Sequence, residues 1–595
     1  MRIFAIILIL VFHSISLNAQ IPAFEGAVGS GAHTSGFRAS NTQVIHVTSL
    51  ADDYQGTPAV GTFRWAMTRT YPRIIIFDVG GMIEMNGMIN LDASHSDYYL
   101  AGQTAPGGIT LHGYGQIQQD GTRQGIVRYI TFANEVDKAR PPNPPGSVED
   151  KRHLTFNNND EGIIDHCTSY FSHNEAFNFW HYGSSGVPAS VGHTISNSII
   201  GEGDTGSLMG GDETAKAAGE VSAIRNLYVH IRHRHPNITG GAEGEIINTI
   251  SYNFRTRVTR VSASSVVNYI GNYVKMGSAS TNTISNRRNI VMDGVIDGTK
   301  VFIDDNNFFD GRYDGVTTAN KYEMFDVTDA GSHTTSSPRP ATSVWTSSTA
   351  FPMVKGVRVS TPLNYSVLQD SLLQNNINGI GANMYLDDDG SKIYISDAKV
   401  LQYFNDVKNG LNANGSGSTY GNEMSPPVYD IPIKTTQTRP AGFDTDGDGM
   451  PNTWELSNGL STTVDDALLK TLDPNGVRFN IEFYLDGNMA VGGSVAATSV
   501  NIVESSLDVP LNGSGQLTLA FTPSNTSDKT GTWTSSNALI ATIGANGEIT
   551  PVAIGATTIT FTSNDGSFTD TATVNITAAA IKKKNNKRWI KIGGL

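Results

Sequence analysis

Residues 226–248 read NLYVHIRHRHPNITGGAEGEIIN, and this stretch decides the fold of the chain. It opens with Asn226 and a short run of alternating apolar residues, followed by a cluster of basic residues that ends at Pro236. A pair of glycines comes next, and the same pattern then begins again at Asn248. A short strand, a cationic turn and a second strand of the same kind indicate a repeat unit with a candidate site at its edge.

Apolar, β-branched runs that begin or end with Asn recur through the first half of the chain. Their starts are spaced by roughly 18 to 30 residues, which is a solenoid period. No helical period separates them, so we predict an all-β parallel β-helix. Stacked Asn side chains would satisfy one another and the turn backbone, although Asn also simply marks turns. The Asn-led starts are Asn197, Asn226, Asn248, Asn268, Asn289 and Asn307.

Length and composition agree with this prediction. A chain of 595 residues suggests two to four domains. Charged residues make up only 16% and glycines number 62, which favours a turn-rich β architecture. The net charge of −14 argues against nucleic-acid binding. An acidic substrate would need a local basic patch, and the chain has one at Arg225, Arg232, Arg234, Arg255, Arg257 and Arg260.

Residues 1–19 predict export. Arg2 precedes the apolar run Ile3–Phe12, and a small residue, Ala19, stands at the expected cleavage point of a signal peptide. No later stretch is long enough to span a bilayer. Cys167 is the only cysteine, so an intrachain disulfide is impossible. We expect a monomer without a transmembrane segment, secreted to the extracellular space, the cell surface or the periplasm.

Five segments follow from the pattern. Residues 1–19 form the signal peptide, and residues 20–440 form the β-helix with a loop-rich C-terminal part. Residues 441–490 form a calcium-binding segment. Residues 498–578 alternate like a small β-sandwich, and residues 579–595 form a basic tail.

The stretch FDTDGDGMPNTWE predicts a structural calcium site. Carboxylates at alternate positions point inward, a glycine makes the sharp bend, and a final Glu binds through both oxygens. The predicted ligands are Asp444, Asp446, Asp448, the backbone of Met450, and Glu455. The plainer interpretation is an acidic turn.

A second, weaker loop follows. Asp473, Asn475 and Glu482 fit the third, fifth and twelfth positions of such a loop, but Thr471 stands at the first position. The residues leave open whether this loop binds a second calcium ion.

Several motifs together resemble a known family. AFEGAVGSGAHTSGFR, RIIIFDVGG, AGQTAPGGITL, IVRYITF, IIDHCTSYFSHNEAF, GSLMGG and RHRHPNI occur in the order seen in secreted bacterial pectate lyases. The resemblance covers roughly residues 22–310 and implies a right-handed parallel β-helix. The calcium stretch resembles thrombospondin type 3-like or dockerin-like segments. Residues 500–577 resemble a bacterial Ig-like domain of group 2.

The resemblance implies an activity, the β-elimination of polygalacturonate with calcium as cofactor. Calcium would neutralise the uronate carboxylate and so acidify the proton on C5. The family uses the Arg of an Arg-x-Pro motif as the base, here Arg234. An alternative is that Arg234 only binds a carboxylate and that a neighbouring histidine is the base. The residues expected to bind substrate are Arg232, His233, His235 and Asn237.

The calcium ligands of the reaction site transfer less completely. The implied set is Asp150, Asn174, Glu175 and Asn178, in which two positions that are often acidic carry amides. Thr205 also stands where some relatives carry a lysine. A site with fewer carboxylates binds calcium more weakly, so a changed substrate or weak activity is an open alternative.

Three other functions compete with pectate cleavage. One is a lyase for another uronate, such as alginate, with the same fold and chemistry. Another is a catalytically impaired, polysaccharide-binding surface protein. A glycoside hydrolase is disfavoured because the sequence has no convincing cluster of catalytic carboxylates.

Overall fold

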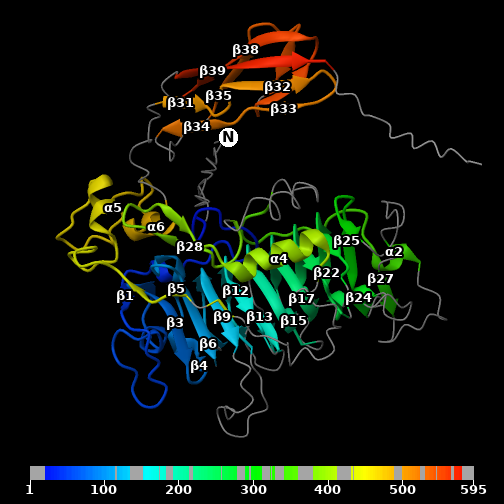
Figure 1. The fold of residues 1–595 in the computed structure, drawn as a ribbon. Coiled ribbons are helices and arrows are strands. Elements are labelled where there is room, and N and C mark those ends of the chain that lie inside the picture. Colours follow the sequence, from blue (N-terminus) through cyan, green and yellow to red (C-terminus); the bar gives the residue numbers. More distant parts are fainter. Residues whose placement is uncertain are drawn as a thin grey trace, which may run out of the picture. The chain divides into compact units, whose positions relative to one another are not determined.

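The computed structural model divides into two units, Met1–Asn488 and Met489–Leu595. The signal peptide, Asp150 and the basic tail lie outside the described residues. The structure describes residues 21–113, 117–134, 152–172, 174–182, 192–212, 219–255, 257–277, 280, 288–293, 297–310, 322, 325–328, 341–359, 379–411, 431–432, 434–487, 499–522, 530–544, 546–564 and 568–578 (Figure 1).

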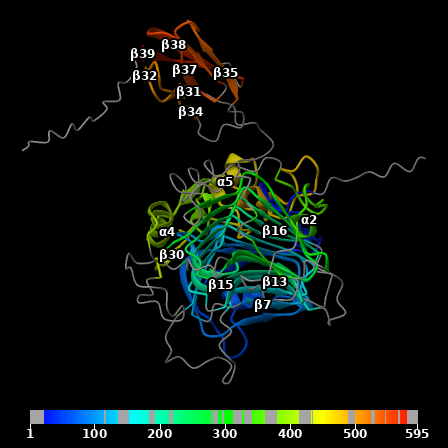
Figure 2. The same cartoon turned by 90° about the vertical axis from the view of Figure 1, so that its right-hand side faces the viewer.

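The first unit is a right-handed parallel β-helix, as predicted, and its coils stack three long faces around one core (Figures 1 and 2). One face is a ten-stranded parallel sheet. Its strands are β1 (Gln43–Val47), β2 (Arg73–Phe77), β5 (Tyr98–Ala101), β8 (Gly125–Arg128), β11 (Glu161–Asp165), β14 (Gly192–Ser196), β16 (Glu220–Ile224), β19 (Glu243–Ile247), β22 (Val266–Ile270) and β25 (Lys300–Ile303).

The other two faces share the long strands β15 (Ile199–Gly211) and β17 (Leu227–His233), which bend from one face to the next. The second face also contains β3 (Val79–Met85), β6 (Ile109–Gly113), β9 (Ile130–Asn134), β12 (Thr168–Tyr170), β20 (Ile250–Tyr252), β23 (Tyr273–Lys275) and β26 (Phe308–Asp310). The third contains β4 (Ile89–Leu91), β7 (Ile117–Asp120), β10 (Leu154–Asn157), β13 (Glu175–His181), β18 (Asn237–Thr239), β21 (Arg257–Val261), β24 (Arg288–Asp293) and β27 (Phe325–Thr328).

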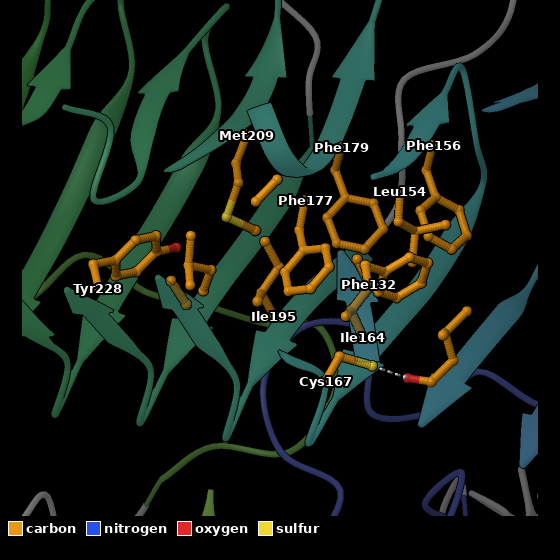
Figure 3. Packing of buried hydrophobic residues seen from close by; sticks show 14 of the residues in the cluster. Phe132, Leu154, Phe156, Ile164, Cys167, Phe177, Phe179, Ile195, Met209 and Tyr228 are labelled. Carbon is orange, nitrogen blue, oxygen red and sulfur yellow. Dashed lines mark hydrogen bonds between the residues drawn. The ribbon is translucent and has the colours of Figure 1, made fainter. Parts of the chain in front are cut away.

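The core follows from the apolar runs of the repeat. Inward side chains of successive coils stack along the axis, which buries them on every side. The rings of Phe156 and Phe179 stack with centroids 4.8 Å apart, and those of Phe132 and Phe177 meet edge to face at 5.8 Å (Figure 3). Cys167 lies among them as a buried free thiol (Figure 3).

The predicted asparagine stack is present at one turn. Asn226 Oδ1 accepts from the amide of Ser198 at 3.0 Å, and Asn272 Oδ1 accepts from the amide of Thr249 at 2.9 Å. Asn307 Oδ1 in turn accepts from the amide of Asn272 at 2.9 Å. These side chains satisfy turn amides that stacking would otherwise bury without partners.

Residues 310–440 contain a helix that the sequence analysis missed. In α4 (Ala398–Asn409), the side chain of Asp397 caps the first turn and Gly410 ends the helix at φ +70°. Tyr403 packs on Tyr170, with ring centroids 6.0 Å apart, and the helix lies across the second face (Figure 1). Lys399 forms a buried ion pair with Glu202 at 2.9 Å.

A few short helices and strands complete the described part of the first unit up to residue 440. One of them is the helix α1 (Phe63–Met67). The others are α2 (Thr342–Trp345), the hairpin β28 (Met384–Leu386) and β29 (Lys392–Tyr394), β30 (Gln437–Thr438), and three single-turn 3-10 helices at Gly36–Arg38, Ala93–His95 and Gly102–Thr104.

The acidic segment that follows packs on the first coils of the β-helix. Its helices are α5 (Asn452–Ser457) and α6 (Asn480–Leu485). Gly449 has φ +98°, and a Cβ there would come within 2.7 Å of Ile76 and 3.1 Å of Val44. Gln103 Nε2 donates to the carbonyl of Leu485 at 3.2 Å. The loop therefore packs against the outer side of strands β1 and β2.

The second unit is a small β-sandwich with its own core of Val500, Val509, Ile549, Ile559 and Phe561. Its strands are β31 (Ser499–Ile502), β32 (Ser506–Pro510), β33 (Gly515–Gln516), β34 (Leu519–Thr522), β35 (Gly531–Ser535), β36 (Ala541–Ile543), β37 (Glu548–Pro551), β38 (Gly555–Ser563) and β39 (Thr569–Thr577). Across the described part of the chain, no helix has the length and apolar character needed to cross a membrane.

Candidate active site and calcium loop

Five arginines gather on the outside of the β-helix, and we call them the arginine strip: Arg152, Arg232, Arg234, Arg257 and Arg260. They come from the start of β10, from β17 and the turn after it, and from β21. Stacking in register brings these segments together, because strands of successive coils lie about 4.8 Å apart. The sequence showed four of the five as neighbours, whereas only the coils bring Arg152 to them.

Three carboxylates pair with the strip. Arg152 Nε lies 2.7 Å from Glu175 Oε2, and Arg234 Nη1 donates to Glu175 Oε1. Two further pairs join Arg232 to Asp204 at 2.7 Å and Arg260 to Asp293 at 2.6 Å. Asp204 and Asp293 were not recognised in the sequence, where no motif distinguishes them from other surface acids.

Arg234 is held in an unusual position. It follows β17 with φ +69°, a left-handed conformation that few non-glycine residues adopt. Its side chain is 24% exposed, so one edge of the guanidinium reaches the surface. Burial and the positive charges of Arg152 and Arg260 lower the pKa of Arg234 to about 10. The structure thus weakens the proton affinity of the predicted base.

Arg257 lies in the coil after Arg234. Burial, followed by the charges of Arg234 and Arg260, lowers the pKa of Arg257 to about 10. Among the described residues no carboxylate forms an ion pair with it, and its Nε is buried without a hydrogen-bond acceptor. The Arg257 side chain as a whole is partly exposed, so this guanidinium can receive an anionic group from outside.

The two histidines beside Arg234 differ from the prediction. His235 is fully buried, stacks on Tyr228 with ring centroids 5.2 Å apart, and places Nε2 3.0 Å from the carbonyl of Ile231. Substrate cannot reach it, so its predicted binding role is wrong. Burial lowers its pKa to about 3. Burial, with Arg257 and Arg232, likewise lowers the pKa of His233 to about 3, which makes it a weak base.

Two asparagines also have structural roles. Asn178 Oδ1 accepts from the amide of Leu208 at 3.0 Å, and Asn237 Oδ1 accepts from the amide of Arg260 at 2.9 Å. Both side chains are buried. They bind neighbouring coils to each other, and their roles in binding metal and substrate stay predictions.

The described residues of this site do not by themselves make up a calcium site. Calcium takes about six to eight oxygens, several of them carboxylate. Of the predicted set, Glu175 is the one described carboxylate, and Arg152 and Arg234 already neutralise it. Asn174 offers an amide oxygen, which lies 3.4 Å from the hydroxyl of Thr205.

The loop at residues 444–466 does fit such an ion. Ligand atoms of Asp444, Asp446 and Asp448 lie within 4.8 Å of one another, and so do those of Asp448, Glu455 and Asp466. Glu455 is 0% exposed, and in the described structure neither of its oxygens has a hydrogen-bond partner. Buried acceptors that converge without donors are the expected surroundings of a bound cation.

The electrostatics of this loop agree with that interpretation. Burial, followed by the charges of Asp448 and Asp446, raises the pKa of Glu455 to about 8. Burial also raises the pKa of Asp448 to about 7. Asp466 was missed in the sequence because it lies beyond the loop motif, and its amide reaches the site by donating to Asp448 Oδ2 at 3.0 Å.

The carboxylates of the second predicted loop are not grouped as those of the first loop are. Glu482 is buried and accepts from Arg38 Nε at 2.9 Å, and Arg478 Nε lies 3.5 Å away. Asp473 accepts from the amide of Asn475 at 2.9 Å and from two further backbone amides. Arginines and backbone amides thus hold these carboxylates, and metal binding by Asp473, Asn475 and Glu482 stays a prediction.

Curated proteins similar to this chain are named as pectate lyases. "Probable pectate lyase C" of Aspergillus terreus is 30% identical over 316 residues, which cover 52% of this chain and 65% of that protein. The protein of the same name from Aspergillus fumigatus is 31% identical over 303 residues, covering 50% of this chain and 64% of the relative. The chain thus spans less than two thirds of these relatives' length.

Two further comparisons concern the fold. A thermostable pectate lyase has a TM-score of 0.40 and 15% identity, over 58% of this chain and 95% of that one. The major allergen from cedar pollen has a TM-score of 0.39 and 15% identity, over 58% of this chain and 90% of that one. Residues 496–574 match the family model "Bacterial Ig-like domain (group 2)".

Proposed function

We propose that this chain is a pectate lyase, an enzyme that cleaves polygalacturonate by β-elimination. The arginine strip carries this proposal, because it offers an acidic polysaccharide a row of guanidinium groups on an otherwise acidic protein. The names of the similar curated proteins support the same substrate.

Arg234 is the proposed base. It takes the proton from C5 of a uronate, the electron pair forms the C4–C5 double bond, and the C4–O4 bond breaks. The departing oxygen takes a proton from water. An arginine is a base only where its surroundings disfavour its charge, and burial beside Arg152 and Arg260 provides such surroundings.

Calcium has a structural role in this proposal. The loop of Asp444, Asp446, Asp448, Glu455 and Asp466 would hold the ion with hard oxygen ligands and, through Gly449, support the first coils. The predicted export of the chain is part of the same proposal, since polygalacturonate is met outside the cell. We also retain the expectation of a monomer.

The decisive experiment is the ultraviolet absorbance of the unsaturated product from polygalacturonate. We expect the wild type to form product and Arg234→Ala to lose about 10²–10⁴-fold in rate. Arg225→Ala is the matched control, because this exposed arginine lies at another corner of the same coil. Product from alginate alone would mean a lyase for another uronate. Binding of pectate without product from either polymer would mean a polysaccharide-binding protein.

A further inference from the structure

The arginine strip holds more positive charge than its described carboxylates neutralise. Glu175 is shared by two arginines, and Asp204 and Asp293 pair with Arg232 and Arg260. Within the described residues, the guanidinium of Arg257 is left without an ion pair. A buried donor without an acceptor costs free energy, so an anionic group brought to Arg257 would be stabilised there.

We infer that Arg257 binds the carboxylate of the uronate at the reaction centre and takes the place that calcium has in the mechanism implied by the family resemblance. This inference rests on the proposed function. It follows from the donor set: the centre offers guanidinium groups to the substrate, and its carboxylates are already paired.

Electrostatics disfavour a divalent cation at this position. Among the described residues of the site, five arginines accompany three acids, so a metal ion would meet net positive charge from them. Arg152 and Arg234 hold both oxygens of Glu175, which would otherwise be the first ligand. The carboxylate of a uronate is negatively charged, so every neighbouring guanidinium attracts it and stabilises its binding.

The guanidinium of Arg257 can also do the chemical work required. Its planar fork matches a carboxylate through two parallel hydrogen bonds. Neutralising that carboxylate stabilises the negative charge that develops when Arg234 removes the C5 proton. The proton and electron balance of the reaction is unchanged, because Arg257 forms no covalent bond.

The first test compares Arg257→Gln with Arg225→Gln, which removes an exposed arginine outside the strip. We expect Arg257→Gln to lower kcat/KM by about tenfold to a hundredfold, the usual loss of a charged hydrogen bond. Its melting temperature should stay close to that of the wild type. Unchanged kcat and KM in folded Arg257→Gln would overturn the inference.

The second test counts calcium ions by equilibrium dialysis on the full chain with Arg234→Lys, which keeps a cation beside Glu175 and should cleave the sugar only slowly. Trigalacturonate is present or absent, and calcium held by the sugar alone is subtracted. We expect the same number of ions per protein in both cases. An additional ion that enters with the sugar would overturn the inference, including one held by Asp150. Because this measurement is made in calcium, a protein that unfolds in chelator is still tested.

The two proposals fail in different ways. A folded wild type that forms no product from polygalacturonate would contradict the proposed function and the inference together. A wild type that forms product and takes up calcium with the sugar would contradict only the inference.

Discussion

The guanidinium of Arg234 donates to the carboxylate of Glu175, although 59 residues separate them in the chain. Glu175 begins β13 and Arg234 follows β17, two coils later. The pair favours the charged form of Arg234, whereas burial and Arg152 oppose it. The proton affinity of the proposed base is set by this balance.

We predict that activity rises with pH toward the pKa of Arg234, about 10. Below that value only the deprotonated fraction reacts, so log kcat/KM should increase with a slope near one. The measurement is the initial rate of product formation in overlapping buffers. A rate that is already constant above about pH 4 would instead indicate a histidine base, because the pKa of His233 is lowered to about 3.

Glu175→Gln should shift this profile to lower pH. Removing the carboxylate takes away the charge that stabilises protonated Arg234, and loss of an adjacent opposite charge moves a pKa by about 1–3 units. Glu243→Gln is a suitable control, because Glu243 is an exposed acid of β19. A profile identical to that of the wild type would show that Glu175 does not tune the base.

Removal of calcium should destabilise the β-helix, and more so at higher pH. The folded-state pKa of Glu455 is raised to about 8, above an unfolded value of about 4.3. A carboxyl group with a raised pKa contributes stability below its unfolded pKa and loses it as pH rises through the folded pKa. In chelator, the melting temperature should therefore fall between about pH 4 and pH 8, and added calcium should restore it.

Glu455→Gln should abolish most of this calcium response. The amide removes one negative charge and the bidentate ligand, so the variant should melt at nearly the same temperature with and without calcium. It should also be less sensitive to pH than the wild type in chelator. Asp508→Asn is a control, because Asp508 lies in the second unit. A full calcium response in Glu455→Gln would place the ion elsewhere.

Lys399→Met should destabilise the first unit by about 3–5 kcal/mol, because it leaves the buried carboxylate of Glu202 without this cation. The double variant Lys399→Met with Glu202→Gln should recover part of the loss. Urea unfolding measures both. Equal losses in the single and double variants would mean that α4 docks through its apolar side chains alone.

Much of the fold was determined by the sequence alone. Apolar runs at a solenoid period require a partner on both sides, and only stacking of coils supplies it, so the β-helix and the asparagine stack were predictable. The grouping of the carboxylates of Asp444, Asp446 and Asp448 was also predictable, because they are close in sequence. α4 was missed since its segment is surrounded by loop-like composition.

The tertiary structure alone decided which charges meet. Sequence spacing shows His235 and Arg234 as neighbours, yet the left-handed turn at Arg234 buries one and exposes the other. Sequence spacing could not show that Arg152 lies beside Glu175, or that Arg38 binds Glu482 from 444 residues away. Charge pairing depends on separation in space, and in a solenoid that separation is set by coil register rather than by position along the chain.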